Sequence, residues 1–594
     1  MTERASPDEN AEPSPETPGP EDRSARDARA RRVRPTNSLR VWLLPFGVLA
    51  SVSLALLLLG FWADVARYDK AAPSLWELLT HPERDEASAV LGNVGQVVTQ
   101  ILGVAISVVA IIVELAATRY THRITELFFK APANFVVMGL FVIAGLDGLW
   151  ISLLFRDTFL PVVGTLLSMG LMSVSVLLLL PYFAYVFQFL NPMNIVGRIR
   201  AEALEGITHA PKTGTQQADA AAHGQFLAAD GTDQLADVAL NAMQNHDGAI
   251  AMASVNALGD LARDYLQVKD RLPLDWFRVT EAMVQDPDFV SMSREVRLAL
   301  GKERTWFEFK VLRQFQTIYQ SGLNAHREVC YVVSILTREL ADAAMARRDG
   351  PVAELCIKFF NTYLRATVNA KDVRTAYNVL NQYRLLADAA LDRRDGRYAV
   401  EVARYFKYYG QLAFQSDLGF ILETAAYDLC ALNEHAFNLR SPERGELLKI
   451  FLQVDKEGEG AAREKSLRGV RKAQIKLATY YLQHDDEAAA REVFQDMKDE
   501  LPARLASIRD ELMAVESSTF WEITDRGTNF DYLPQARKDQ LFRFFAWFGG
   551  ALPEPRMSLP GAGHPRGLSG PHAAAASDPP EPADAKAPDE RAAE

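Results

Sequence analysis

Residues 90–117 read VLGNVGQVVTQILGVAISVVAIIVELAA, and this stretch decides the fold class. Glu114 is the one charged residue in its 28 positions. A helix needs about 20 predominantly apolar residues to cross the hydrocarbon core of a bilayer. The stretch therefore predicts a membrane-spanning helix, and with it an integral membrane protein.

Three further apolar runs are long enough to cross a bilayer, at about 41–63, 135–155 and 160–190. Together with 90–117, these runs predict a four-helix transmembrane region within residues 39–200. We therefore expect the lipid bilayer to be one partner of the chain. The first run is followed by no small-residue cleavage site, so we expect an anchor and not a removable signal peptide.

Basic residues near the spans predict the orientation, because loops on the cytoplasmic side carry more Lys and Arg. Four flank the spans on one side: Arg67, Lys70, Arg84 and Arg156. Twelve flank them on the other: Arg23, Arg26, Arg29, Arg31, Arg32, Arg34, Arg40, Arg119, Arg123, Lys130, Arg198 and Arg200. Both termini are therefore expected in the cytoplasm. The 47 Arg against 17 Lys are a hint of a GC-rich bacterial genome, so we expect a bacterial inner membrane.

Small and polar residues form a stripe along 90–117. They recur at intervals of three and four: Asn93, Gln96, Gln100, Gly103, Ser107, Ala110, Glu114 and Ala117. This spacing places them on one helix face, and such a face is not expected to point at lipid. Two interpretations stay open. The face packs closely against other helices, or it lines a water-filled path on the axis of a homo-oligomer.

Asp147 lies near the middle of the expected span 135–155. An ionised carboxylate there costs at least about 2.5 kcal/mol, so an intramembrane acid is a candidate functional residue. A neutral carboxylic acid that is hydrogen bonded to a neighbouring helix is the alternative.

The rest of the chain is predicted to be helical. We expect a linker at 201–231, a helical cytoplasmic region at 232–319 and a helical-repeat domain at 320–550. The repeat is visible as LADAAMARRDGPVA from Leu340 and LADAALDRRDGRYA from Leu386, identical at ten of fourteen positions at an offset of 46. Such units predict tetratricopeptide-like helical hairpins in an α-solenoid-like domain, although 46 exceeds the 34-residue tetratricopeptide period. Gly350 and Gly396 are expected to end helices in the left-handed conformation.

Composition excludes several classes. Residues 1–38 and 551–594 lack apolar periodicity and are predicted to be disordered tails. A net charge of −12 argues against a nucleic-acid partner. The three cysteines show no metal spacing and fit free thiols. No catalytic motif is present, so we expect a non-enzymatic protein with no catalytic residue, metal or cofactor.

Residues 103–142, GVAISVVAIIVELAATRYTHRITELFFKAPANFVVMGLFV, carry a resemblance to a widespread bacterial family of predicted multi-pass membrane proteins of unassigned function. The likeness extends over about 90–200, with a fainter echo at 234–261. The family resembles this chain at Ser107, Glu114 and Arg123, and usually has no acid at the position of Asp147. The resemblance implies the membrane topology and no activity.

Together these features predict an all-α, self-associating membrane protein. The leading hypothesis is a channel-like or solute-permeation protein with a cytoplasmic helical regulatory domain. The alternative is a membrane-anchored scaffold or signalling protein whose helical-repeat domain binds a protein partner. Oligomer symmetry separates the two, because a pore needs the stripe around a central axis.

Overall fold

A computed structural model of the chain describes Ser51, Ala55, 84–119, Thr125, Phe128, Phe129, 131–153, 162–208, 217–455, 461–520 and 526–549. The chain divides into two compact units, Met1–Ile195 and Val196–Glu594. The described residues are helices joined by turns, with a single isolated bridge between Thr519 and Thr528. The all-helical fold class is thereby confirmed for the described part of the chain.

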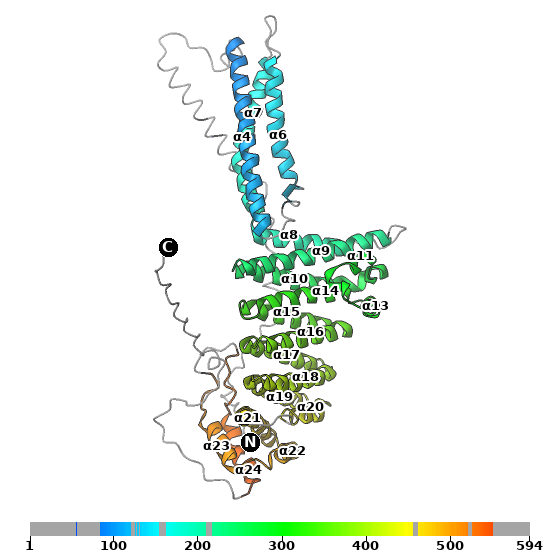
Figure 1. The fold of residues 1–594 in the computed structure, drawn as a ribbon, viewed down its shortest axis with the longest axis vertical. Helices are drawn as coiled ribbons and strands as arrows, with labels where there is room; N and C mark the ends of the chain where they lie inside the picture. The colour runs from blue at the N-terminus through cyan, green and yellow to red at the C-terminus, as the bar shows by residue number, and fades with distance from the viewer. Residues whose placement is uncertain are drawn as a thin grey trace, which may run out of the picture. The chain divides into compact units, whose positions relative to one another are not determined.

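The first unit contains α4 (Arg84–Arg119), α6 (Pro132–Leu153) and α7 (Val162–Phe189). All three pack against one another, and Figure 1 shows them side by side. Within them, Gly92–Thr118, Pro132–Leu153 and Val162–Phe189 are long and apolar enough to cross a membrane. Three spans are therefore found among the described residues, where the sequence predicts four.

The remaining prediction, a span at 41–63, lies outside the described residues apart from Ser51 and Ala55. The same holds for the expected tails at 1–38 and 551–594.

Small residues let α6 and α7 approach closely. A Cβ on Gly148 of α6 would lie 2.0 Å from the Cε of Met172 on α7. Phe141, Ala144 and Val186 are among the buried apolar side chains of these two helices. Because lipid is as apolar as the helix surfaces, this close van der Waals packing is what favours association of the spans.

The second unit is a succession of helices. It begins within α8 (Pro192–Thr208) and continues through α9 (Gln217–Gln244), α10 (Gly248–Val268), η1 (Lys269–Arg271), η2 (Leu274–Phe277), α11 (Glu281–Val284), α12 (Pro287–Val290), α13 (Arg294–Lys302), α14 (Trp306–Gly322), α15 (Arg327–Ala346), α16 (Gly350–Asn369), α17 (Val373–Asp392), α18 (Gly396–Gln415), α19 (Gly419–Asn438), α20 (Arg444–Phe451), α21 (Ala461–Gln483), α22 (Glu487–Met497), α23 (Pro502–Ala514) and α24 (Gln535–Ala546). Figure 1 shows α9 to α21 stacked largely in chain order.

Aromatic rings line the core between neighbouring helices. The ring of Tyr319 on α14 stacks on that of Tyr363 on α16, with centroids 4.5 Å apart. The rings of Phe360 on α16 and Tyr383 on α17 stack at 4.8 Å. All four side chains are fully buried, so they belong to a core that joins α14, α16 and α17.

The helices α15 to α19 are evenly spaced. Each is 20 residues long, and each begins 23 residues after the one before. The turns that follow them place a non-glycine residue at positive φ, again 23 residues apart: Arg348, Lys371, Arg394, Asp417 and Arg440. The 46-residue offset in the sequence thus equals two of these steps.

The left-handed residues were predicted at the wrong positions. Gly350 and Gly396 do not end helices; they are the first residues of α16 and α18. Arg348 and Arg394, two residues earlier, hold the left-handed conformation with φ of 60° and 59°. An arginine there carries a steric cost that glycine lacks. At Gly396 the glycine instead accommodates a neighbour, because a Cβ would lie 2.4 Å from the side chain of Glu443.

The linker expected at 201–231 is also corrected. Residues 201–208 continue α8, and 217–231 form the first half of α9. The glycines and alanines in this stretch serve a close helix crossing: a Cβ on Gly224 would lie 2.5 Å from the carbonyl oxygen of Gly206, and one on Gly231 would lie 2.6 Å from the Cβ of Ala203. A composition typical of a flexible segment here allows tight packing.

Candidate functional site

The polar stripe of α4 is exposed, although two of its members, Gln96 and Gln100, border a cavity shared with α6. Only Ala117 of the stripe is buried. The other members are all exposed: Asn93, Gln96, Gln100, Gly103, Ser107, Ala110 and Glu114. The face of α4 that packs in the bundle is a different one, carrying Val98, Ala105, Val109 and Val113. The stripe is therefore not a packing face within the described three-helix bundle.

Part of the stripe borders a cavity. A cavity of about 470 Å³ lies between α4 and α6, and Gln96, Thr99 and Gln100 line it from α4. Gly145 lines it from α6, where an added Cβ would lie 3.2 Å from the hydroxyl of Thr99. The small residues of α6 thus open space beside two amide side chains.

Few polar side chains of the stripe form hydrogen bonds with described residues. The Ser107 hydroxyl donates to the carbonyl oxygen of Gly103 at 2.9 Å. The amides of Asn93, Gln96 and Gln100 make no hydrogen bond in the part of the chain that the structure describes. A polar group left unpaired in hydrocarbon costs several kcal/mol, so this face requires a polar partner beyond the described bundle.

Asp147 lies on α6, next to the closely packed Gly148. Its Oδ2 atom is buried and accepts no hydrogen bond within the described residues. Asp147 does not line the cavity beside Gln96 and Gln100. The two features singled out in the sequence, the stripe and the acid, are thus not brought together in one site.

Sequence reasoning missed a buried polar contact in the same unit. Asn134, in the first turn of α6, is 3% exposed. Its amide donates to the carbonyl oxygen of Phe128, and its Oδ1 accepts from the hydroxyl of Tyr182 on α7 at 3.3 Å. The hydrogen bond from Tyr182 links α7 to α6. The sequence signal for it was an asparagine at the start of an apolar run.

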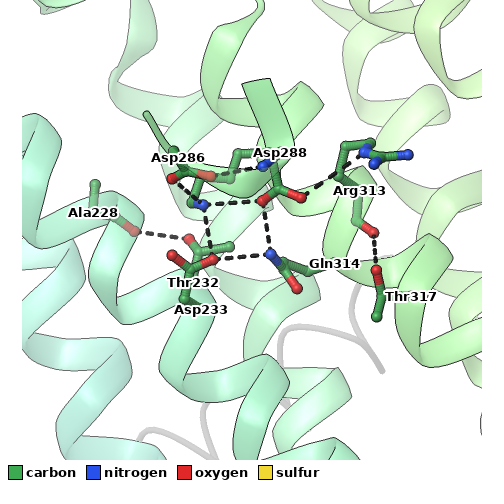
Figure 2. A network of polar contacts seen from close by, with 9 residues as sticks. Ala228, Thr232, Asp233, Asp286, Asp288, Arg313, Gln314 and Thr317 are labelled. Carbon is green, nitrogen blue, oxygen red and sulfur yellow. Dashed lines mark hydrogen bonds and ion pairs between the residues drawn. The ribbon is translucent and has the colours of Figure 1, made fainter. Parts of the chain in front are cut away.

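A buried lysine in the second unit was also missed. The side chain of Lys310, on α14, is fully buried. Its ammonium group lies 2.6 Å from Asp286, 3.0 Å from Asp288 and 2.8 Å from Asp233 on α9. Figure 2 shows these carboxylates converging with Gln314, whose amide donates to Asp288 at 2.7 Å and to Asp233 at 2.9 Å.

The charges of this cluster do not balance. One lysine faces three carboxylates, and burial raises the pKa of Asp233 to about 7 against the opposing effect of the ammonium group. The cluster joins α9, α14 and the turn at α12, and no carboxylate in it is left free to attack a substrate. We therefore assign it a role in holding α9 against α14.

A second buried lysine lies nearby in the sequence. Lys269 of η1 places its ammonium group 2.6 Å from both Glu308 of α14 and Asp349, which precedes α16. Glu308 is fully buried, and its Oε2 makes no hydrogen bond among the described residues. Burial therefore raises the pKa of Glu308 to about 7, although Lys269 opposes the shift.

This shift predicts a pH-dependent stability. The unfolded chain releases the Glu308 proton near pH 4.5 and the folded chain near 7, so the folded state binds more protons between these values. The free energy of unfolding should fall as pH rises from 5 to 8, by on the order of 3 kcal/mol. Thermal unfolding of Glu308→Gln should show a flatter profile. Glu303→Gln, at an exposed position, should keep the slope of the original chain; equal slopes in all three proteins would contradict the assignment.

The described residues offer little for metal or thiol chemistry. They contain no group of three or more His, Cys, Asp or Glu side chains placed to hold a metal ion. Cys330, Cys356 and Cys430 are free thiols, and all three are buried. Burial raises the pKa of all three thiols, which makes them poor nucleophiles.

Comparison with known proteins confirms the family resemblance. A family model described as Predicted membrane protein (DUF2254) matches residues 39–269, a range that includes both 90–200 and the echo at 234–261. Neither the curated proteins nor the solved structures contain a match. The matched range also holds all three candidate spans. Residues 39–269 of this chain are therefore similar to the predicted membrane proteins that the DUF2254 model describes.

Proposed function

We propose that the chain is a non-enzymatic inner-membrane protein that forms a homo-oligomer, in which the α4 stripes of neighbouring copies surround a narrow polar path for an ion or small solute. The observation that carries this proposal is the exposure of Asn93, Gln96, Gln100, Ser107 and Glu114 on the outside of a membrane-spanning bundle. These groups need a polar environment, and a second copy presents the same groups in return.

The second unit supports a regulatory role in this proposal. Its evenly spaced helices, in which Tyr319, Tyr363 and Tyr383 are buried between neighbours, resemble an α-solenoid built from tetratricopeptide-like hairpins. Such stacks present long surfaces to protein partners. We assign this unit and both termini to the cytoplasm, following the twelve basic residues on that side of the spans.

The competing function is a membrane-anchored scaffold whose spans only anchor the second unit. In that case the stripe is covered by another segment, such as the expected span at 41–63, and copies of α4 do not meet. No observed contact of the second unit favours a particular partner. The two functions differ in whether α4 lies next to α4 of another copy.

Cross-linking between copies tests the proposal. We expect a cysteine at Gln100 or Ser107 to join two copies through a short bifunctional thiol reagent, in membranes that contain the full chain. Because the native cysteines are buried, they add little background. The control is a cysteine at Val108, which is 38% exposed on α4 and lies neither three nor four residues from any member of the stripe.

The readout is the fraction of covalent dimer on a denaturing gel. A dimer at Gln100 and Ser107 but not at Val108 supports stripes that face each other. Equal yields at all three positions, or dimer at none of them, would contradict the shared path and favour the scaffold.

A further inference from the structure

A large basic cavity opens on the second unit, apart from the buried lysine clusters. It measures about 1030 Å³ and lies among η2, α11 and α13. Five of its lining residues are cationic: Arg278, Arg294, Arg297, Lys302 and Arg304. Among the residues whose side chains the structure describes, no carboxylate lines it. In a chain with a net charge of −12, such a local excess of positive charge marks a place that favours an anion.

Most of these cations lack a carboxylate partner. Arg278 forms one ion pair, at 3.3 Å to Asp275, and is itself 79% exposed in its side chain. Arg297 donates to the carbonyl oxygen of Met292, and Arg304 lies 5.0 Å from the centre of the Phe277 ring. Their charges are therefore only weakly compensated.

Arg294 and Lys302 stand at opposite ends of α13. Both are exposed, and neither makes a hydrogen bond or ion pair in the described part of the chain. The nearest acids in sequence, Glu295 and Glu303, are exposed and do not line the cavity. Two cations from one short helix are thus available to a ligand without first breaking another contact.

The wall of the cavity is held rigidly. The carbonyl oxygen of Trp276 accepts hydrogen bonds from the indole of Trp306 at 2.8 Å and from Gln225 at 2.6 Å. Gln225 also donates to the carbonyl oxygen of Arg278 at 2.8 Å. Gly301 lets α13 approach η2, because a Cβ there would lie 3.0 Å from the carbonyl oxygen of Phe277. A rigid wall reduces the entropic cost of ordering the site on binding.

The cavity also has an apolar side. Leu274 is 72% exposed and Leu298 is 63% exposed, and both line it beside the cations. Val279 and Val284 add to this surface. A small inorganic anion would leave these side chains in water, whereas a ligand with an apolar part would cover them.

We propose that this cavity, which we name the α13 pocket, binds a phosphate-bearing anion that carries an apolar portion. Guanidinium groups present several donors in a plane and recognise phosphate oxygens through paired hydrogen bonds. Arg294, Arg297 and Lys302 supply the charge from α13, while Leu298 contacts the apolar portion. The proposal is independent of the polar path in the membrane, because it uses none of the stripe residues.

Binding to the full chain in neutral detergent micelles tests this proposal. Isothermal titration at low ionic strength would use three probes: inorganic pyrophosphate, dihexanoyl phosphatidylglycerol and dihexanoyl phosphatidylcholine. The last is the control, because its headgroup is zwitterionic and has no net charge. We expect pyrophosphate or the phosphatidylglycerol to bind and phosphatidylcholine not to bind. Salt should weaken binding, because the cations are exposed.

Substitutions in the α13 pocket test whether the probes bind there. Arg294→Gln with Lys302→Gln should weaken binding by roughly tenfold or more, since a hydrogen bond to a charged group contributes about that factor. Arg444→Gln with Lys449→Gln, an equal charge change at exposed positions of α20, should leave it unchanged. Leu298→Ser should weaken binding of phosphatidylglycerol and leave pyrophosphate unaffected.

The two sources of phosphate are separated by the probes. Binding of phosphatidylglycerol that depends on Leu298 supports a lipid headgroup, and binding of pyrophosphate alone supports a soluble phosphate compound. The proposal is overturned if neither probe binds, or if the α13 variant binds both as tightly as the original chain. Circular dichroism melting curves verify that each variant is folded.

Discussion

Replacing Lys310 by methionine should lower the free energy of unfolding of the second unit by about 3–5 kcal/mol, because it removes the cation that three buried or half-buried carboxylates share. Only Arg313, 3.9 Å from Asp288, would remain beside them. Methionine keeps much of the volume and apolar stem of lysine, so the loss reports the charge. Urea unfolding followed by tryptophan fluorescence, to which the buried Trp276 and Trp306 of this unit contribute, measures it.

Two further variants separate charge from packing. Lys358→Met, at an exposed position of α16, should change stability by less than about 0.5 kcal/mol. Asp286→Asn with Asp288→Asn should recover part of the loss in the Lys310→Met background, because it removes two of the unpaired charges. An unfolding midpoint for Lys310→Met equal to that of Lys358→Met would mean that the cluster does not hold α9 to α14.

The membrane-spanning helices could be predicted from the sequence because their signal is local. The span expected at 90–117 is found at Gly92–Thr118, and the span expected at 135–155 is found at Pro132–Leu153. Length and hydropathy decide such segments without knowledge of their neighbours. The same local reasoning detected the 46-residue offset, since it compares letters in one chain.

Local composition misled where its meaning depends on packing. Residues 201–231 carry the Gly and Ala content of a flexible linker, yet Gly206, Gly224 and Gly231 stand where α8 and α9 cross. The glycine at 396 was expected to end a helix, but Arg394 adopts the left-handed conformation instead. Neither outcome can be read from a window of a few residues, because each depends on a second helix or turn.

The buried lysines lay beyond this kind of reasoning altogether. Lys310 meets Asp233 and Asp288 only after α9, α12 and α14 have packed, and these partners lie far apart in the chain. A lone lysine in an amphipathic helix is ordinarily solvated, so no pattern marked it. The α13 pocket was missed for the same reason, since its cations come from η2, α13 and the turn after α13.

The stripe is the part of the candidate site that the sequence located best. Its members were placed on one helix face, and the structure exposes all of them except Ala117. What the sequence left open was the direction of that face, because a helical period gives no reference to neighbouring helices. The buried face with Val98, Val109 and Val113 now supplies that reference.

The proposed function requires that the exposed stripe of α4 meets water inside the membrane. Single cysteines at Gln96, Gln100, Ser107 and Glu114 test the claim most directly, through their rates of reaction with a small charged methanethiosulfonate reagent in membranes that contain the full chain. Val108 and Leu115 provide matched controls, since they are also exposed on α4 and lie neither three nor four residues from any stripe position.

We expect the stripe cysteines to react on the order of 50- to 100-fold faster than the controls, because a charge at the bilayer centre costs at least about 2.5 kcal/mol and the reagent needs a thiolate. Equal rates at Gln100 and Val108, or protection of every stripe position, would contradict a polar path and leave the stripe as a covered packing face.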